Sequence, residues 1–135
     1  MKSHFYHIQI NINYGNMSFY KDLMTFLGWQ VIFEKTDVIG FKSGTNGDLW
    51  FVKTPQDEFN DYDNLGVNHL SIRVENQKDV DDVVSFLQKH HISTLFHTPK
   101  HRPEFTGNDS ETYYQIMFES PDRVLFEIVY IGLKR

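Results

Sequence analysis

Apolar and polar residues alternate along the segment YHIQINI, residues 6 to 12, and this period of two predicts a strand with one polar face. The next segment, NMSFYKDLMTFLGW (16 to 29), carries apolar residues at helical spacing. Asn16 can cap its start and Gly28 can close its end, so we expect a helix. Three short β-rich runs separated by turn residues then follow: QVIFEK, VIGFKS and DLWFVKT.

The second half of the chain repeats this order. NHLSIRV (68 to 74) alternates, and KDVDDVVSFLQKHH (78 to 91) has one apolar helical stripe, with acidic residues near its start and basic ones near its end. The runs STLFHT, YYQIMFE and RVLFEIVY then predict three strands. Each half therefore reads strand, helix, strand, strand, strand.

The polar, acidic stretch TPQDEFNDYDNLG separates the halves and has no periodicity. We predict an α+β protein with a single domain over residues 1 to 135. Module 1 spans about 4 to 54, a linker about 55 to 66, and module 2 about 67 to 132. Each module is βαβββ, and the mixed sheets curl around a cleft with the helices outside. Aligning the sequences of the two halves matches His7 to His69, with an insertion at 100 to 112 in the second half.

Composition narrows the function. The 135 residues carry a net charge of −5 and no concentrated run of Lys or Arg, which argues against a nucleic-acid partner. No apolar run approaches the roughly 20 residues of a membrane span. The amino terminus resembles no signal peptide, so we expect a cytoplasmic protein. The chain has no Cys, so any metal must be held by His, Asp, Glu or Gln.

These features resemble the vicinal oxygen chelate superfamily, which includes glyoxalase I, bleomycin-resistance proteins, fosfomycin-resistance enzymes and extradiol dioxygenases. The likeness covers essentially the whole chain. It rests on the paired modules, on the helix SFYKDLMTFLGW and on the ending ESPDRVLFEIV, in which a turn precedes a strand bearing a glutamate. Arg123 stands where that turn usually has glycine.

The resemblance implies a metal site on the first and last strands of each module. Carried over by position, the ligands are His7, His69 and Glu127, and the fourth position falls on Phe51. Two imidazoles and one carboxylate suit a divalent ion such as Mn, Ni, Fe, Co or Zn, and three ligands leave room for substrate oxygens. Glu127 is also the candidate catalytic residue. Alternation independently places all three candidate ligands on polar faces.

No single subfamily fits. Phe51 cannot bind a metal, which disfavours an ordinary glyoxalase I. Gln9 stands where the fosfomycin enzymes have threonine, and Met117 where extradiol dioxygenases usually have tyrosine. We therefore expect a metal-dependent lyase, isomerase or transferase acting on a small oxygenated substrate. The alternatives are a metal-free drug-binding or metabolite-binding protein of the bleomycin-resistance kind, a fosfomycin-resistance-like transferase and an extradiol-type dioxygenase.

Several polar residues share the predicted faces or lie on the inserted loop. Those expected to contact a small-molecule substrate are Gln9, Phe51, Ser71, Arg73, His101 and Arg102. The loop at 100 to 112 has the length of loops that cover sites. Taken singly, each candidate also has a structural explanation, such as an edge-strand carboxylate or a core histidine. Family members commonly pair, so we expect a homodimer, with His7 meeting His69 of the same chain or of a partner.

Overall fold

A computed structural model describes residues 1 to 45 and 47 to 135. The chain divides into two compact units, Met1–Phe59 and Asn60–Arg135, and the division falls inside the predicted linker. Each unit holds one α-helix, one short 3₁₀ helix and one four-stranded sheet. This arrangement confirms the predicted α+β fold of two βαβββ modules. No helix in the described ranges has the length and apolar character needed to cross a membrane.

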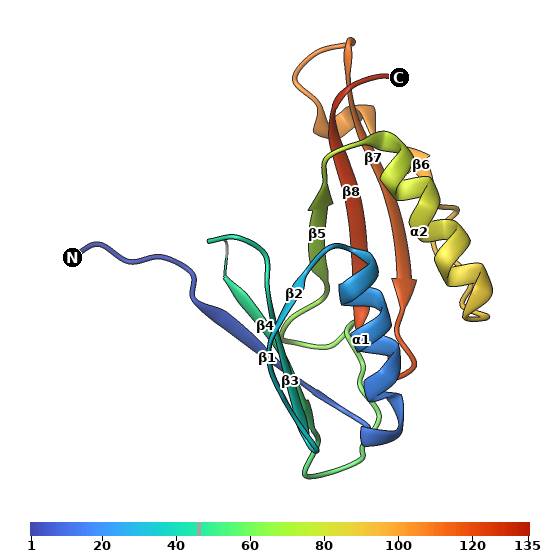
Figure 1. The fold of residues 1–135 in the computed structure, drawn as a ribbon. Helices are drawn as coiled ribbons and strands as arrows, with labels where there is room; N and C mark the ends of the chain where they lie inside the picture. The colour runs from blue at the N-terminus through green and yellow to red at the C-terminus, as the bar shows by residue number, and fades with distance from the viewer. Residues whose placement is uncertain (46) are drawn as a thin grey trace. The chain divides into compact units, whose positions relative to one another are not determined.

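In the first unit the sheet has the order β1-β4-β3-β2, with β1 parallel to β4 and the other pairs antiparallel (Figure 1). Its elements are β1 (His7–Ile12), η1 (Tyr14–Asn16), α1 (Met17–Phe26), β2 (Gln30–Lys35), β3 (Val38–Lys42) and β4 (Asp48–Lys53).

Helix α1 covers one face of this sheet. Its buried residues, Phe19, Tyr20, Leu23 and Met24, recur at the three-to-four-residue spacing that places them on one stripe. The helix ends before Gly28, whose φ of +83° is a left-handed conformation that glycine adopts without steric cost. The core of the first unit therefore lies between α1 and the sheet.

In the second unit the sheet has the order β5-β8-β7-β6, again with one parallel pair, β5 with β8. Figure 1 shows α2 lying along one face of this sheet. The elements are β5 (Leu70–Val74), α2 (Gln77–Lys89), β6 (Lys100–His101), η2 (Pro103–Phe105), β7 (Glu111–Glu119) and β8 (Leu125–Leu133).

Helix α2 begins with a capping box. The side chain of Asp79 accepts a hydrogen bond from the backbone N–H of Asn76 (2.9 Å), and this contact satisfies a group that the first turn leaves unpaired. The helix buries Val80, Val83, Phe86 and Leu87. His90 ends it, with Nδ1 of its ring 2.9 Å from the carbonyl oxygen of Phe86.

The prediction of a strand over STLFHT is wrong. Phe96 and His97 have left-handed φ values of 55° and 57°, and the N–H of Thr98 donates to the carbonyl of Leu95 (3.0 Å). The run therefore contains a tight turn, with only a single bridge from Thr94 to Phe118. The strand that completes the module is β6, inside the segment predicted as a loop.

Candidate functional site

His69 has one ring nitrogen fixed by its neighbour in the sequence. The Nδ2 of Asn68 donates to the carbonyl oxygen of Tyr62 (3.0 Å), which leaves the amide Oδ1 to face Nδ1 of His69 at 2.8 Å. Because an amide oxygen only accepts hydrogen bonds, Nδ1 must carry the proton. The contact with Asn68 thus places a proton on Nδ1 and leaves Nε2 to face a second partner.

Nε2 of His69 points at Glu127 on β8. It lies 3.1 Å from Oε2 of that carboxylate. Glu127 is 4% exposed, whereas the side chain of His69 is 36% exposed, so the pair runs from the interior of the unit to its surface. Phe126 and Ile128, on either side of Glu127, are fully buried on the α2 side, and strand alternation therefore turns Glu127 to the opposite face.

Tyr113 on β7 holds the second oxygen of this carboxylate. Its hydroxyl donates a hydrogen bond to Oε1 of Glu127. Burial, followed by the hydrogen bond to Glu127, raises the pKa of Tyr113 to about 12, so the phenol stays protonated at neutral pH. A hydrogen bond from Ser71 acts in the opposite direction on this pKa. Tyr113 therefore fixes the orientation of Glu127 and leaves Oε2 directed at His69.

The geometry of the pair fits a shared metal ion. Two ligand atoms that each lie about 2.1 Å from a metal and subtend a right angle are about 3.0 Å apart. The distance from His69 Nε2 to Glu127 Oε2, 3.1 Å, matches this separation. Over residues 1 to 45 and 47 to 135, no group of three or more His, Asp or Glu side chains is gathered that could hold a metal ion. Of the three predicted ligands, His69 and Glu127 are brought together within the second unit.

We call the face of the second sheet that bears Glu127 the open face, because α2 covers the other one. Three predicted substrate residues lie on it. Ser71 is opposite Glu127 in the β5–β8 register, and Arg73 is opposite Val129 two residues further along. The backbone N–H of Arg102 donates to the carbonyl oxygen of Tyr113 (2.7 Å), which places Arg102 beside the same face.

His101, also predicted to contact the substrate, lies on the other face of this sheet, away from Glu127. It is opposite Tyr114 in the β6–β7 register, and their rings stack with centroids 4.5 Å apart. Tyr114 points toward α2, where its hydroxyl donates to Oδ1 of Asp81 (2.8 Å). The period of two that places Arg102 on the open face therefore turns His101 toward the helix.

Phe51 also differs from its prediction. Its ring is completely buried in the core of the first unit and stacks on Tyr20 of α1, with ring centroids 4.6 Å apart. In the first sheet Gln9 is opposite Trp50, and in the second sheet Ser71 is opposite Glu127. Gln9 and Ser71 each lie two residues after the aligned histidine, so the counterpart of Glu127 in the first module is Trp50. The predicted alignment of the last strands was one residue out of step, which exchanged the two faces.

The first unit presents His7 and Gln9 on the face that carries Trp50. His7 is exposed and opens β1, opposite Asp48, with its ring packed edge-on to Tyr6 at 5.0 Å. The Nε2 of Gln9 donates to Oδ1 of Asn11 (3.0 Å). A separate cavity of about 550 Å³ lies near the start of α1, and neither His7 nor Gln9 lines it.

Sequence reasoning missed Tyr113 and Phe105. Met117 is the register partner of Glu127, and Tyr113 lies four residues before Met117 on the same strand. Strand alternation therefore turns Tyr113 to the face that bears Glu127, and this alternation could have identified it from the sequence. Phe105 lies in a polar loop whose sequence predicts no contact. Its ring packs edge-on to Tyr113 at 5.2 Å, so it is joined to the site only by tertiary structure.

No protein-family model matches the sequence, and no curated protein sequence matches it. Solved structures do match. A candidate glyoxalase from Bacillus halodurans is 23% identical, with a TM-score of 0.73 over 94% of this chain and 93% of its own. A glyoxalase/bleomycin resistance protein from Albidiferax ferrireducens is 15% identical, with a TM-score of 0.72 over 93% and 97%. A glyoxalase/dioxygenase from Nostoc punctiforme is 17% identical, with a TM-score of 0.68 over 97% and 91%.

The fold is thus that of the glyoxalase/bleomycin resistance protein/dioxygenase proteins, the vicinal oxygen chelate fold. This is the fold that the sequence resemblance predicted. At these identities the likeness establishes the architecture, and the activity has to be argued from the site.

Proposed function

We propose that this protein is a divalent-metal-dependent enzyme of the glyoxalase superfamily, of lyase, isomerase or transferase type, acting on a small oxygenated substrate. The observation that carries the proposal is the pair His69 and Glu127. A carboxylate oxygen and an imidazole nitrogen whose proton is on the far side face each other at 3.1 Å. Two lone pairs at this distance repel unless a cation or a proton lies between them.

A divalent ion satisfies both atoms and suits the donor set. Imidazole and carboxylate bind Mn, Ni, Fe, Co and Zn, and a bound ion would polarise adjacent oxygens of the substrate as a Lewis acid. Glu127 is held by Tyr113 through one oxygen and presents the other. Asn68 supports His69 in the way that ligating histidines are usually oriented, through the second ring nitrogen.

His7 is the third ligand that we propose, on the fold resemblance and on its place at the start of β1, which matches that of His69 before β5. It would come from the same chain or from the partner in a homodimer. Ser71, Arg73 and Arg102 on the open face of the second sheet, together with Gln9, would orient substrate oxygens through their polar groups. Glu127 would serve as the proton-handling carboxylate of the reaction.

Metal analysis of protein purified without a histidine tag tests the proposal. After incubation with Mn, Ni, Fe(II), Co or Zn and removal of free ion, we expect one ion per chain, and we expect His69→Ala and Glu127→Gln to lose it. The matched control is His90→Ala, because His90 caps a helix through the carbonyl of Phe86. Wild-type protein that retains no metal under any of these conditions would refute the enzyme proposal.

A second candidate function is metal-free binding of a planar drug or metabolite, as in bleomycin-resistance proteins. It is supported by the aromatic face of the first sheet. Trp50 is half-buried and lies over Gly40, where an added Cβ would be 2.7 Å from the indole, and its ring is 5.7 Å from that of Phe33. In this case Nε2 of His69 would carry a proton and pair with Glu127 as an imidazolium.

Fluorescence separates this candidate from the first. A planar apolar ligand is expected to quench the emission of Trp50, so Trp50→Phe should lose the response and Trp29→Phe should keep it. Calorimetry with divalent ions would then show no heat. Heat with metal and no quenching would favour the enzyme.

A further inference from the structure

Two arginines flank one position of the open face. The Nη2 of Arg73 donates to the carbonyl oxygen of Ile131 (2.8 Å), which turns its guanidinium along β8. The backbone N–H of Arg102 donates to Tyr113, and Tyr113 is the register partner of Ile131. Arg73 itself is opposite Val129, so its guanidinium reaches the Tyr113–Ile131 rung from the neighbouring rung on the β5 side, whereas Arg102 adjoins that rung from the β6 side.

A third cation lies on the neighbouring rung. Lys100 is opposite Gln115, Gln115 is opposite Val129, and Val129 is opposite Arg73. We call the basic end of the open face the set of Arg73, Lys100 and Arg102. A net charge of −5 for the whole chain makes such a gathering of cations on one face a local exception to its acidic composition.

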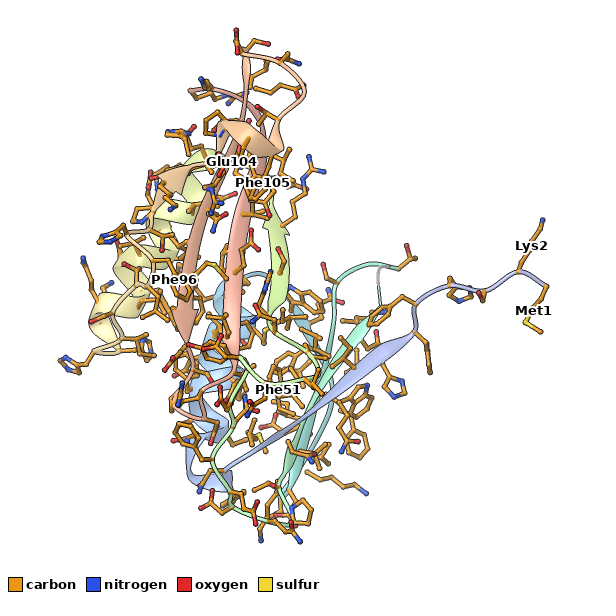
Figure 2. All side chains as sticks on the ribbon, turned by 180° about the vertical axis from the view of Figure 1, so that it is seen from behind. Met1, Lys2, Phe51, Phe96, Glu104 and Phe105 are labelled. Carbon is orange, nitrogen blue, oxygen red and sulfur yellow. The ribbon has the colours of Figure 1, made fainter. Side chains whose placement is uncertain are left out.

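Arg102 is held in place by its surroundings. Its guanidinium lies 4.7 Å from the ring centroid of Phe105, and its Nε donates to the carboxylate of Glu104. Figure 2 shows Glu104 and Phe105 next to each other on η2. The Glu104 side chain is 51% exposed, against 28% for Arg102. The counter-ion is thus the more hydrated partner, and replacing it with another anion costs little, because exposed ion pairs contribute little free energy.

We propose that the basic end binds the anionic group, a phosphate or a carboxylate, of a substrate whose oxygenated end reaches the His69–Glu127 pair. This inference rests on the proposed function and names its substrate class. Ile131 is four residues beyond Glu127 on β8, which corresponds to about 13 Å along the strand. The guanidinium of Arg73 is directed along β8 toward Ile131 and away from Glu127, so the substrate has an elongated shape, with the charge remote from the reacting oxygens.

The test uses chelator-treated protein, so that no metal contributes, and two simple probes, inorganic phosphate and succinate. Chemical shifts of backbone amides are followed during each titration. We expect saturable shifts around residues 73 and 100 to 113, with dissociation constants in the millimolar range. Arg102→Gln and Arg73→Gln should each weaken binding about tenfold, which is the usual contribution of one charged hydrogen bond.

Two further variants make the test directional. Glu104→Gln should tighten binding, because it removes the anion that competes for Arg102. Lys78→Gln should leave binding unchanged, because Lys78 pairs with Asp82 on the exposed side of α2. The proposal is overturned if neither probe saturates, or if Arg102→Gln and Lys78→Gln behave alike. Because the protein is metal-free here, a failure of metal uptake leaves this result interpretable, and the tighter of the two probes identifies the class of anion.

Discussion

The hydroxyl of Tyr113 donates to one oxygen of Glu127 while the other oxygen faces His69 at 3.1 Å. Tyr113 and Tyr114 are adjacent on β7, yet they point to opposite faces of the sheet, the first to Glu127 and the second to Asp81. The two tyrosines are therefore a useful pair of positions for testing the site, because each loses one hydroxyl when changed to Phe and Tyr113 is the one of the two whose hydroxyl contacts Glu127.

We predict that Tyr113→Phe weakens metal binding about 10-fold to 100-fold, the usual effect of removing a partner of a metal ligand. Tyr114→Phe should leave metal affinity unchanged, since its hydroxyl contacts only the helix side. Isothermal titration with Mn or Zn measures both. Equal affinities for the two variants would show that Tyr113 has no role in orienting Glu127.

A second prediction concerns the tautomer of His69. Asn68→Leu removes the acceptor that faces Nδ1, and we expect about a 10-fold or greater loss of metal affinity. Asn68→Asp keeps an acceptor oxygen and should retain most of the affinity. Both variants lose the hydrogen bond to the carbonyl of Tyr62, so their comparison isolates the contact with His69. An equal loss of metal affinity in the two variants would show that Asn68 acts only through its hydrogen bond to the backbone of Tyr62.

Alkaline titration gives a third prediction. Burial raises the pKa of Tyr113 and of Tyr114 from 10.0 to about 12. Folding thus favours the protonated phenols, so their contribution to stability is complete below pH 10 and is lost as the pH rises toward 12. Tyrosinate absorbance should show a late-titrating component, and each Tyr→Phe variant should reduce it. Its free energy of unfolding should also decline less between these pH values than that of the wild type.

The placement of Phe51 and Trp50 on opposite faces of β4 gives a fourth prediction. Phe51→Ala empties a fully buried position stacked on Tyr20, and we expect a loss of about 3 to 5 kcal/mol of unfolding free energy. Trp50→Ala, on the half-buried outer face, should cost less stability but abolish any stacking ligand. Chemical denaturation of both variants measures the difference. A larger loss for Trp50 would place it in the core.

Local sequence pattern determined most of the elements. The alternation around His7 and His69, the apolar stripes of the two helices and the turn before Glu127 all act within a few residues, so a sequence alone reveals them. The turn is instructive, because Arg123 adopts the left-handed φ of 56° that glycine usually supplies. The order strand, helix, strand, strand, strand in each half, and the fold resemblance, follow from such local signals.

Tertiary structure decided which face each residue occupies and what it meets. A shift of one residue in the pairing of β4 moves Phe51 into the core and Trp50 out of it, because successive side chains alternate across a strand. The same alternation separates His101 from Arg102. The hydroxyl of Tyr113 on β7 contacts Glu127 on β8. The sequence pattern shows which face each side chain occupies, but it does not show which side chains on that face touch. The sequence thus determined the architecture and pointed to His69 and Glu127, and the pairing register determined the residues that surround these two.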